Sequence, residues 1–236
     1  MSEITHWING KTFDDSAKRH GEIFNPATGE VSKKVAFGTS ATVDVAVKAA
    51  TDAFAEWRHS SLTKRVNVLF AFRELVNTNK EKIAALITAE HGKVLSDAAG
   101  EVTRGLEVVE FACGIPHLLK GGFSEEVSTG VDVYSIRQAL GPVAIISPFN
   151  FPAMVPMWFF PVAIACGNTV IVKPSGNPAS FQSCAKNMAA LGSFSDGLTM
   201  TVFPHAIATG KNHIGTIAGK LNGEIIATGP SAWRIE

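Results

Sequence analysis

Two polar side chains, Asn150 and Lys173, border an apolar stretch and could carry out chemistry there. Asn150 is the only amide in the run 147–160, "SPFNFPAMVPMWFF", and Lys173 is the first charged residue after position 137. A positioned amide can donate a hydrogen bond to a developing negative charge, and an ammonium offers three donors to hydroxyl or anionic groups. Turn or helix-cap chemistry for Asn150, and an extended, solvated lysine before a proline, are the alternatives.

The segment around these residues predicts a parallel βαβ unit. Residues 143–146 and 169–172 are short β-branched runs, typical of strands buried on both faces. Between them, a helix is expected from Pro152 to Ala165 or Cys166, bent by two internal prolines and stopped by a glycine. The crossover should be right-handed. Ligands bind outside the carboxyl ends of parallel strands, so both polar residues are expected at one crevice.

A membrane-spanning segment is the other interpretation of this stretch. Residues 138–172 contain no charged side chain, which is long enough to cross a bilayer. Five prolines interrupt the stretch, and lipid offers no water to satisfy the backbone groups that they free. The buried βαβ unit is therefore favoured.

The N-terminal half predicts β-hairpins followed by helices. Asn9-Gly10 within "HWINGKTF" is a two-residue hairpin signal, and residues 24–37 repeat the pattern, so a small antiparallel layer is expected. Apolar spacing then changes to a helical period. The helices are expected at 40–57, from 63 to about 79, at 80–90, and at 101–113.

The last of these helices carries Arg104 among apolar residues on two faces, which predicts burial on both sides. A guanidinium keeps its charge, so Arg104 needs an anionic partner. A local pair with Glu101 or Glu107 is favoured on residue spacing. A substrate carboxylate is the sharper alternative.

Composition excludes several classes of function. Lys plus Arg and Asp plus Glu number 21 each, without blocks of like charge, which argues against nucleic-acid or charged membrane partners. The three cysteines lack metal-ligand spacing and indicate reduced thiols, and no metal site is expected. The N-terminus lacks the layout of a secretion signal. We therefore expect a cytoplasmic protein that handles a small molecule.

Several motifs together resemble one enzyme family. "SPFNFPAMVPMWFFPVAIACGNTVIVKPS" is similar to the cofactor-binding signature of the aldehyde dehydrogenase superfamily, and its wording is nearest to the CoA-acylating methylmalonate- and malonate-semialdehyde dehydrogenases. "NPATGEV", "RVNVLFAFRELV" and "AEHGKVLSDAAGEVTRGLEVVEFACG" extend the likeness. It covers residues 4 to 175 almost continuously.

The resemblance implies roles for individual residues. Asn150 would be catalytic, helping to hold the oxyanion formed when a thiolate attacks an aldehyde, and Arg104 would bind the substrate's carboxylate. The cofactor NAD would be bound by Ser147, Phe149, Lys173 and Ser175. CoA would be the co-substrate that accepts the acyl group. The family is homo-oligomeric.

The implied fold is α/β: an aldehyde dehydrogenase-like NAD-binding domain with N-terminal hairpins, a helical segment and a parallel βαβ unit. We expect residues 1–175 to form the N-terminal part of this domain, and residues 176–236 to be a divergent tail of uncertain fold. After Ser175 the family's glutamate is replaced by Gly176. The catalytic domain, including the nucleophile loop and the oligomerisation region, is expected to be missing.

None of the three cysteines has surroundings that predict a reactive thiol: Cys113, Cys166 and Cys184 are interpreted as packing residues. The functional hypothesis is thus a CoA-acylating dehydrogenase lineage in which this chain alone is inactive. A non-catalytic fragment that binds NAD or associates with other subunits is the alternative. A third is an incompletely folded product that lacks sheet partners and exposes an edge.

Overall fold

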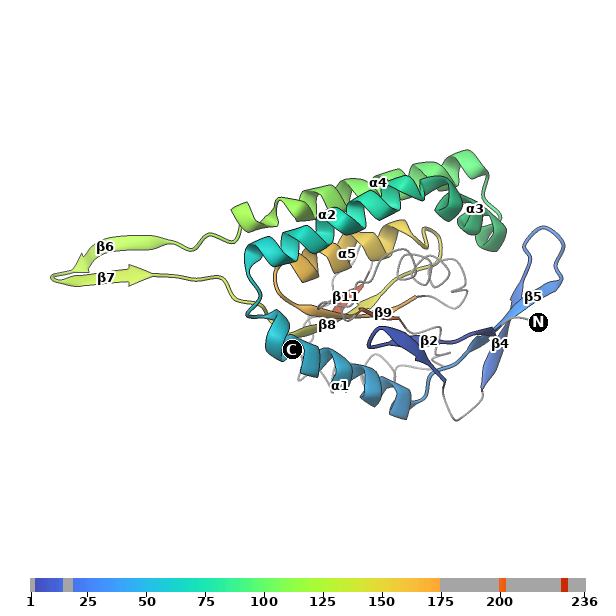
Figure 1. Ribbon diagram of the computed structural model, residues 1–236, viewed down its shortest axis with the longest axis horizontal. Coiled ribbons are helices and arrows are strands. Elements are labelled where there is room, and N and C mark those ends of the chain that lie inside the picture. The colour runs from blue at the N-terminus through green and yellow to red at the C-terminus, as the bar shows by residue number, and fades with distance from the viewer. Residues whose placement is uncertain (1–2, 15–18, 175–199, 203–225, 229–236) are drawn as a thin grey trace.

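The computed structural model describes residues 3–14, 19–174, 200–202 and 226–228 of the 236-residue chain. Ser175 and Cys184 lie outside these residues. The described part is arranged in three layers: a mixed sheet, one helix on one face of it, and a group of helices on the other (Figure 1).

The main sheet has six strands in the order β11-β8-β9-β10-β2-β3. The four strands β11, β8, β9 and β10 pair in parallel, and the β2–β3 hairpin adds to β10 in antiparallel orientation. Residues beyond 175 therefore supply a strand on each side of the β8–β9 pair. The hypothesis of a fold without sheet partners is wrong on this point. The bounds are β2 His6–Ile8, β3 Lys11–Phe13, β8 Pro142–Ile146, β9 Thr169–Lys173, β10 Met200–Val202 and β11 Ile226–Thr228.

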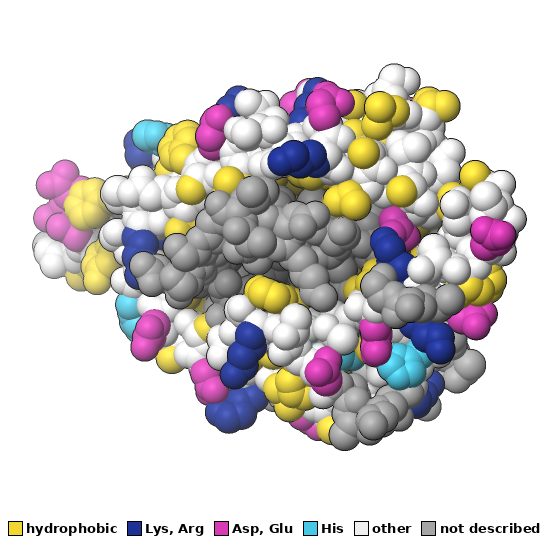
Figure 2. All heavy atoms as spheres, turned by 45° about the vertical axis from the view of Figure 1, so that its right-hand side comes forward, with side chains coloured by type: hydrophobic (Ala, Val, Ile, Leu, Met, Phe, Trp, Pro, Cys, Tyr) yellow, Lys and Arg dark blue, Asp and Glu magenta, His cyan; other side chains and the backbone are white. Residues whose placement is uncertain are grey.

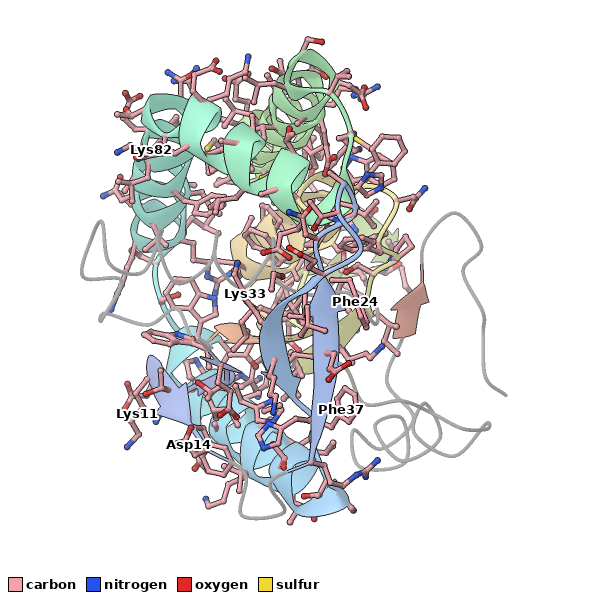
Figure 3. All side chains as sticks on the ribbon, turned by 90° about the vertical axis from the view of Figure 1, so that its right-hand side faces the viewer. Lys11, Asp14, Phe24, Lys33, Phe37 and Lys82 are labelled. Carbon is pink, nitrogen blue, oxygen red and sulfur yellow. The ribbon has the colours of Figure 1, made fainter. Side chains whose placement is uncertain are left out.

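Both predicted hairpins are confirmed, but they do not form one layer. Asn9 and Gly10 have φ values of 51° and 75°, the left-handed pair that a tight turn between β2 and β3 requires. The second hairpin, β4 (His20–Phe24) and β5 (Val31–Ala36), instead joins β1 (Glu3–Ile4) in a separate three-stranded sheet. Lys33 of β5 holds this sheet to the helices, because its Nζ lies 2.5 Å from Glu90 Oε1 (Figure 3).

The βαβ prediction is confirmed. Helix α5 (Met154–Ala165) connects β8 to β9, which pair in parallel from Pro142↔Thr169 to Ile146↔Lys173. Gly167, at φ 88°, follows the helix. The helix begins two residues after Pro152 and contains both predicted prolines, Pro156 in its first turn and Pro161 in its interior. Among the residues that the structure describes, no helix is both long and apolar enough to cross a membrane.

Helix α1 lies against one face of the sheet, and helices α2 to α5 lie on the other (Figure 1). Thr39 caps α1 through a reciprocal pair of hydrogen bonds with Thr42, and Ser61 caps α2 by accepting from Lys64 N. The largest hydrophobic cluster joins α2, α3, α4 and α5 to strands β8 and β9. The bounds are α1 Ser40–Trp57, α2 Leu62–Thr78, α3 Lys80–His91 and α4 Leu95–Cys113.

Helix α4 begins six residues before the predicted start at 101, and only one of its faces is fully buried. Val102, Leu106 and Val109 point into the core, as expected. The second apolar face is not covered, since Phe111 is 57% exposed. The expectation of burial on both sides is therefore wrong, and Arg104, on this second face, is exposed.

After the short helix η1 (Ile115–His117), a hairpin of β6 (Phe123–Ser128) and β7 (Val131–Tyr134) projects from the body. Both strands are exposed along their whole length. Figure 2 shows this hairpin at the left, with acidic and hydrophobic side chains on its surface.

Candidate active site

The carboxyl ends of β8 and β9 meet at one edge of the sheet, where the sequence placed its two polar residues. Ile146 is the register partner of Lys173, and the next amide, Ser147 N, donates to Lys173 O at 3.2 Å. Asn150 follows three residues later, in the loop that leads to α5. The segments carrying Asn150 and Lys173 thus start from neighbouring strand ends.

Lys173 is partly buried, and burial lowers the pKa of its ammonium from the ordinary value. No carboxylate of the described residues pairs with it. The side chain is therefore not fully solvated, as the alternative expected. An ammonium that is partly desolvated and has no carboxylate partner among the described residues retains donors for hydroxyl or anionic groups of a ligand.

Ser147 adds a second unsatisfied group beside Lys173. The Ser147 side chain is 3% exposed, and its Oγ has no hydrogen-bond partner within the described part of the chain. Buried hydroxyls are normally paired, so this oxygen is suited to a polar ligand. The pair fits the hydroxyl-rich ribose of a dinucleotide such as NAD.

The Asn150 side chain is exposed, and no described residue forms a hydrogen bond with its amide. Helix α5 has Ala153 as its N-cap residue, without a side-chain cap from its own segment. The alternative that Asn150 serves as a cap is therefore not observed. Its amide is free to donate to an oxygen in front of the loop.

A carboxylate from another helix caps α5 instead. Glu101 of α4 is fully buried, and its Oε1 accepts from the backbone N–H groups of Ala153 at 2.8 Å and Met154 at 3.1 Å. An acidic group at a helix N-terminus satisfies orphan donors and complements the helix dipole. Glu101 therefore fixes the start of α5 directly behind the Asn150 loop.

Lys93 completes this network. Its Nζ lies 2.7 Å from Glu101 Oε2 and 3.1 Å from the backbone oxygen of Asn150, which it holds in place. The sequence did not predict a role for Lys93, and Glu101 was expected only as a partner for Arg104. One signal was available: "NFPA" before α5 offers no capping side chain at positions 151–153, so a cap had to come from elsewhere.

Arg104 lies at the same loop but not with its predicted partners. The described structure has it in a weak pair with Asp97 at 3.8 Å, and the favoured pairs with Glu101 or Glu107 are absent. Its Cζ lies 5.5 Å from the ring centroid of Phe151, the residue after Asn150. Half of the Arg104 side chain is exposed, and its contact with Phe151 places it at the Asn150 loop, where a ligand carboxylate can reach it.

Phe149 is partly buried, with its ring centroid 5.3 Å from that of His91. Its predicted role toward the cofactor stays a prediction, as does that of Ser175, which lies outside the described residues. The predicted packing role fits the two described cysteines. Burial raises the pKa of the thiols of Cys113 and Cys166, so little reactive thiolate forms at neutral pH.

The arrangement can bind and orient a small polar ligand. It offers an amide donor, a nearby guanidinium and, from the adjacent strand, an ammonium beside a buried hydroxyl. Within the described residues it has no activated thiol and no cluster able to hold a metal ion.

Comparison with known proteins identifies similar sequences and structures. A family model, "Aldehyde dehydrogenase family", matches residues 13–212, so the likeness continues beyond Ser175, where it was predicted to end. A malonate-semialdehyde dehydrogenase of Pseudomonas aeruginosa is 49% identical over 175 residues, covering 74% of this chain and 35% of that protein. An acylating, mitochondrial methylmalonate-semialdehyde dehydrogenase of Arabidopsis thaliana is 48% identical over 172 residues, covering 73% of this chain and 28% of that protein.

A crystal structure of a related protein shows the same similarity in three dimensions. A protein described as a methylmalonate-semialdehyde dehydrogenase from Sinorhizobium meliloti 1021, in complex with NAD, superposes with a TM-score of 0.84 at 37% identity. The match covers 97% of this chain and 50% of that one. The chain thus spans half or less of the length of each of these three proteins.

Proposed function

Because the chain belongs to the aldehyde dehydrogenase family, we propose that its site serves the NAD-dependent oxidation of malonate or methylmalonate semialdehyde to an acyl-CoA. The observation that carries the proposal is the Asn150 loop. Lys93 and Glu101 hold it beside Arg104, at the sheet edge that ends in Lys173.

Each residue has a role in this proposal. The Asn150 amide donates to the aldehyde oxygen as negative charge develops there, and because the loop is already positioned, no reorganisation is needed during the reaction. Arg104 pairs with the carboxylate of the semialdehyde. Lys173 and Ser147 donate to the ribose hydroxyls of NAD, and Phe149 packs nearby. Bound NAD supplies the hydride acceptor, and CoA receives the acyl group.

We further propose that this chain alone does not turn over. The two described thiols, Cys113 and Cys166, have raised pKa values, so the described residues provide no activated nucleophile. NADH formation, followed by absorbance with malonate semialdehyde, NAD and CoA, tests this directly. A sustained rate that disappears in Asn150→Ala would contradict inactivity while supporting the assigned chemistry.

The second candidate function is binding without catalysis, as an NAD-binding or subunit-associating fragment. Two features favour NAD binding: the buried Ser147 hydroxyl, and the Lys173 ammonium, which has no carboxylate partner among the described residues. Titration calorimetry with NAD should show saturable binding that Lys173→Ala weakens at least about tenfold. Lys48→Ala is the matched control, because Lys48 is exposed and paired with Asp52. Equal binding by all three proteins would remove Lys173 from the site.

The remaining expectations extend this proposal. We propose a small semialdehyde as the substrate, with neither nucleic acid nor membrane as a partner, and a cytoplasmic location. The Arabidopsis relative is named as mitochondrial. Fractionation of the expressing cells decides between the two locations.

A further inference from the structure

A second cavity lies at the other end of α5, away from the Asn150 loop. It has a volume of about 500 Å³ and is bounded by the connection between α1 and α2, by residues 136–139 and by Cys166 after α5. In Figure 1 the connection between α1 and α2 lies at the left, toward the base of the β6–β7 hairpin. Helix α5 has 12 residues and is about 18 Å long, which separates the cavity from the candidate active site.

Three arginines, Arg58, Arg65 and Arg137, line this cavity, and its lining contains neither Asp nor Glu. Within the described part of the chain, none of the three forms an ion pair with a carboxylate. Elsewhere the protein pairs such groups: Arg73 lies 2.7 Å from Glu110. Among the residues that the structure describes, the positive charge of this cavity is therefore not compensated by a carboxylate.

Arg65 is the buried member, with a relative exposure of 8%. Its Nε donates to Ser60 Oγ at 3.1 Å and its Nη2 donates to the backbone oxygen of Arg58 at 2.8 Å, both neutral acceptors. Nη1 has no hydrogen-bond partner among the described residues. It faces Gly167, where a Cβ atom would lie only 2.6 Å away. A guanidinium stays charged even when buried, and no carboxylate among the described residues serves as its counter-ion.

The exposed members complete the site. Arg137 is exposed and donates from Nε to the backbone oxygen of Lys120, which leaves its terminal nitrogens available. Arg58 is also exposed and lies at the end of α1. Ser61 and Leu62, at the start of the 17-residue helix α2, line the cavity as well.

We propose that this cavity is a second binding site, for a small anion that carries a phosphate group. A tetrahedral phosphate offers more acceptor oxygens than a carboxylate and suits several guanidinium groups at once. The volume is in the range of small-molecule sites. A ligand there would supply the counter-ion that Arg65 lacks.

Titration calorimetry with inorganic phosphate, on the full chain at constant ionic strength set with chloride, tests the proposal. Saturable binding is expected, and the double variant Arg58→Gln, Arg137→Gln should weaken it at least about tenfold. Both positions are exposed, so the double variant should fold, which its melting curve checks. Arg73→Gln, which removes an arginine that already has a carboxylate partner, should bind phosphate as the wild type does.

Lys173→Ala separates this site from the proposed NAD site and should keep its phosphate affinity. Absence of saturable phosphate binding, or equal binding by wild type and double variant, would overturn the proposal. So would a loss of phosphate binding in Lys173→Ala alone, since that would place the anion at the nucleotide edge. Failure of NAD binding leaves this result unaffected, because the two titrations use different residues.

Discussion

The two ends of helix α5 differ in how the buried charges beside them are paired. At its start, Glu101 and Lys93 are buried together at 2.7 Å, and the carboxylate also accepts two backbone N–H groups. At its end, Arg65 is buried with neutral acceptors only. A buried ion pair whose hydrogen bonds are all satisfied holds the neighbouring backbone in position. A buried charge without a charged partner can instead bind an oppositely charged ligand. The first end is built to position a loop and the second to receive an anion.

Removing the carboxylate at the start of α5 should have the largest effect. Glu101→Ala leaves Lys93 buried without its partner and the first turn of α5 without its cap, so we expect a loss of about 3–5 kcal/mol in unfolding free energy. Urea denaturation measures it. Asp97→Asn is the control: this exposed carboxylate lies 3.7 Å from Lys93, and its loss should cost less than about 1 kcal/mol. Equal effects of the two variants would deny Glu101 a special role.

At the end of α5, stability should depend on the absence of a side chain at Gly167. Gly167→Ala forces a left-handed backbone on an alanine and pushes a methyl group into the Arg65 guanidinium, so we expect a loss of about 1–3 kcal/mol. Gly100→Ala is the matched control, since nothing lies within 4 Å of its new methyl group and alanine favours the helix. Thermal melting of both variants should move in opposite directions. A neutral Gly167→Ala would show that Arg65 is not held against this turn.

The main elements around α5 could be predicted from the sequence because their signals are local. The β-branched runs predicted strands β8 and β9, and Asn9-Gly10 predicted the turn between β2 and β3. The glycine at position 167 predicted where α5 ends. The Lys93–Glu101 network could not be predicted in the same way, because its bonds join residues up to 57 positions apart in the sequence. Residue spacing suggested a local partner for Arg104, but the helix turns Glu101 into the core, toward α5.

Pairings over long distances in the sequence also escaped prediction. The β2–β3 hairpin was expected beside β4 and β5, yet it adds to β10, nearly two hundred residues along the chain. The sequence after residue 175 showed no clear alternation of helix and strand, although three-residue strands there join the sheet at both sides of β8–β9. Strands this short give too few residues for a period of two to stand out.

Substitution of Lys173 should have a smaller effect on unfolding free energy, and it should stabilise the protein. The pKa of Lys173 is lowered in the folded state, so folding disfavours the charged form of this side chain. The resulting loss of unfolding free energy is fully present below the pKa of the folded state. It disappears as the pH rises from that pKa toward the pKa of the unfolded state. Lys173→Met should therefore stabilise the protein at neutral pH, by about 1 kcal/mol, and this gain should shrink at alkaline pH. Urea denaturation across pH measures it. A variant less stable than wild type at neutral pH would mean that Lys173 has a stabilising partner.

Substitution of Arg104 should give the smallest change in unfolding free energy, because Arg104 lies outside the Lys93–Glu101 network. Half of its side chain is exposed, its pair with Asp97 is long, and its stacking on Phe151 is worth about 0.5–1 kcal/mol at such a site. Arg104→Gln should therefore lower the unfolding free energy by no more than about 1 kcal/mol. Arg73→Gln, at a partly exposed arginine, is the control in the same urea titration. A loss as large as that of Glu101→Ala would instead make Arg104 a member of the structural network formed by Lys93 and Glu101.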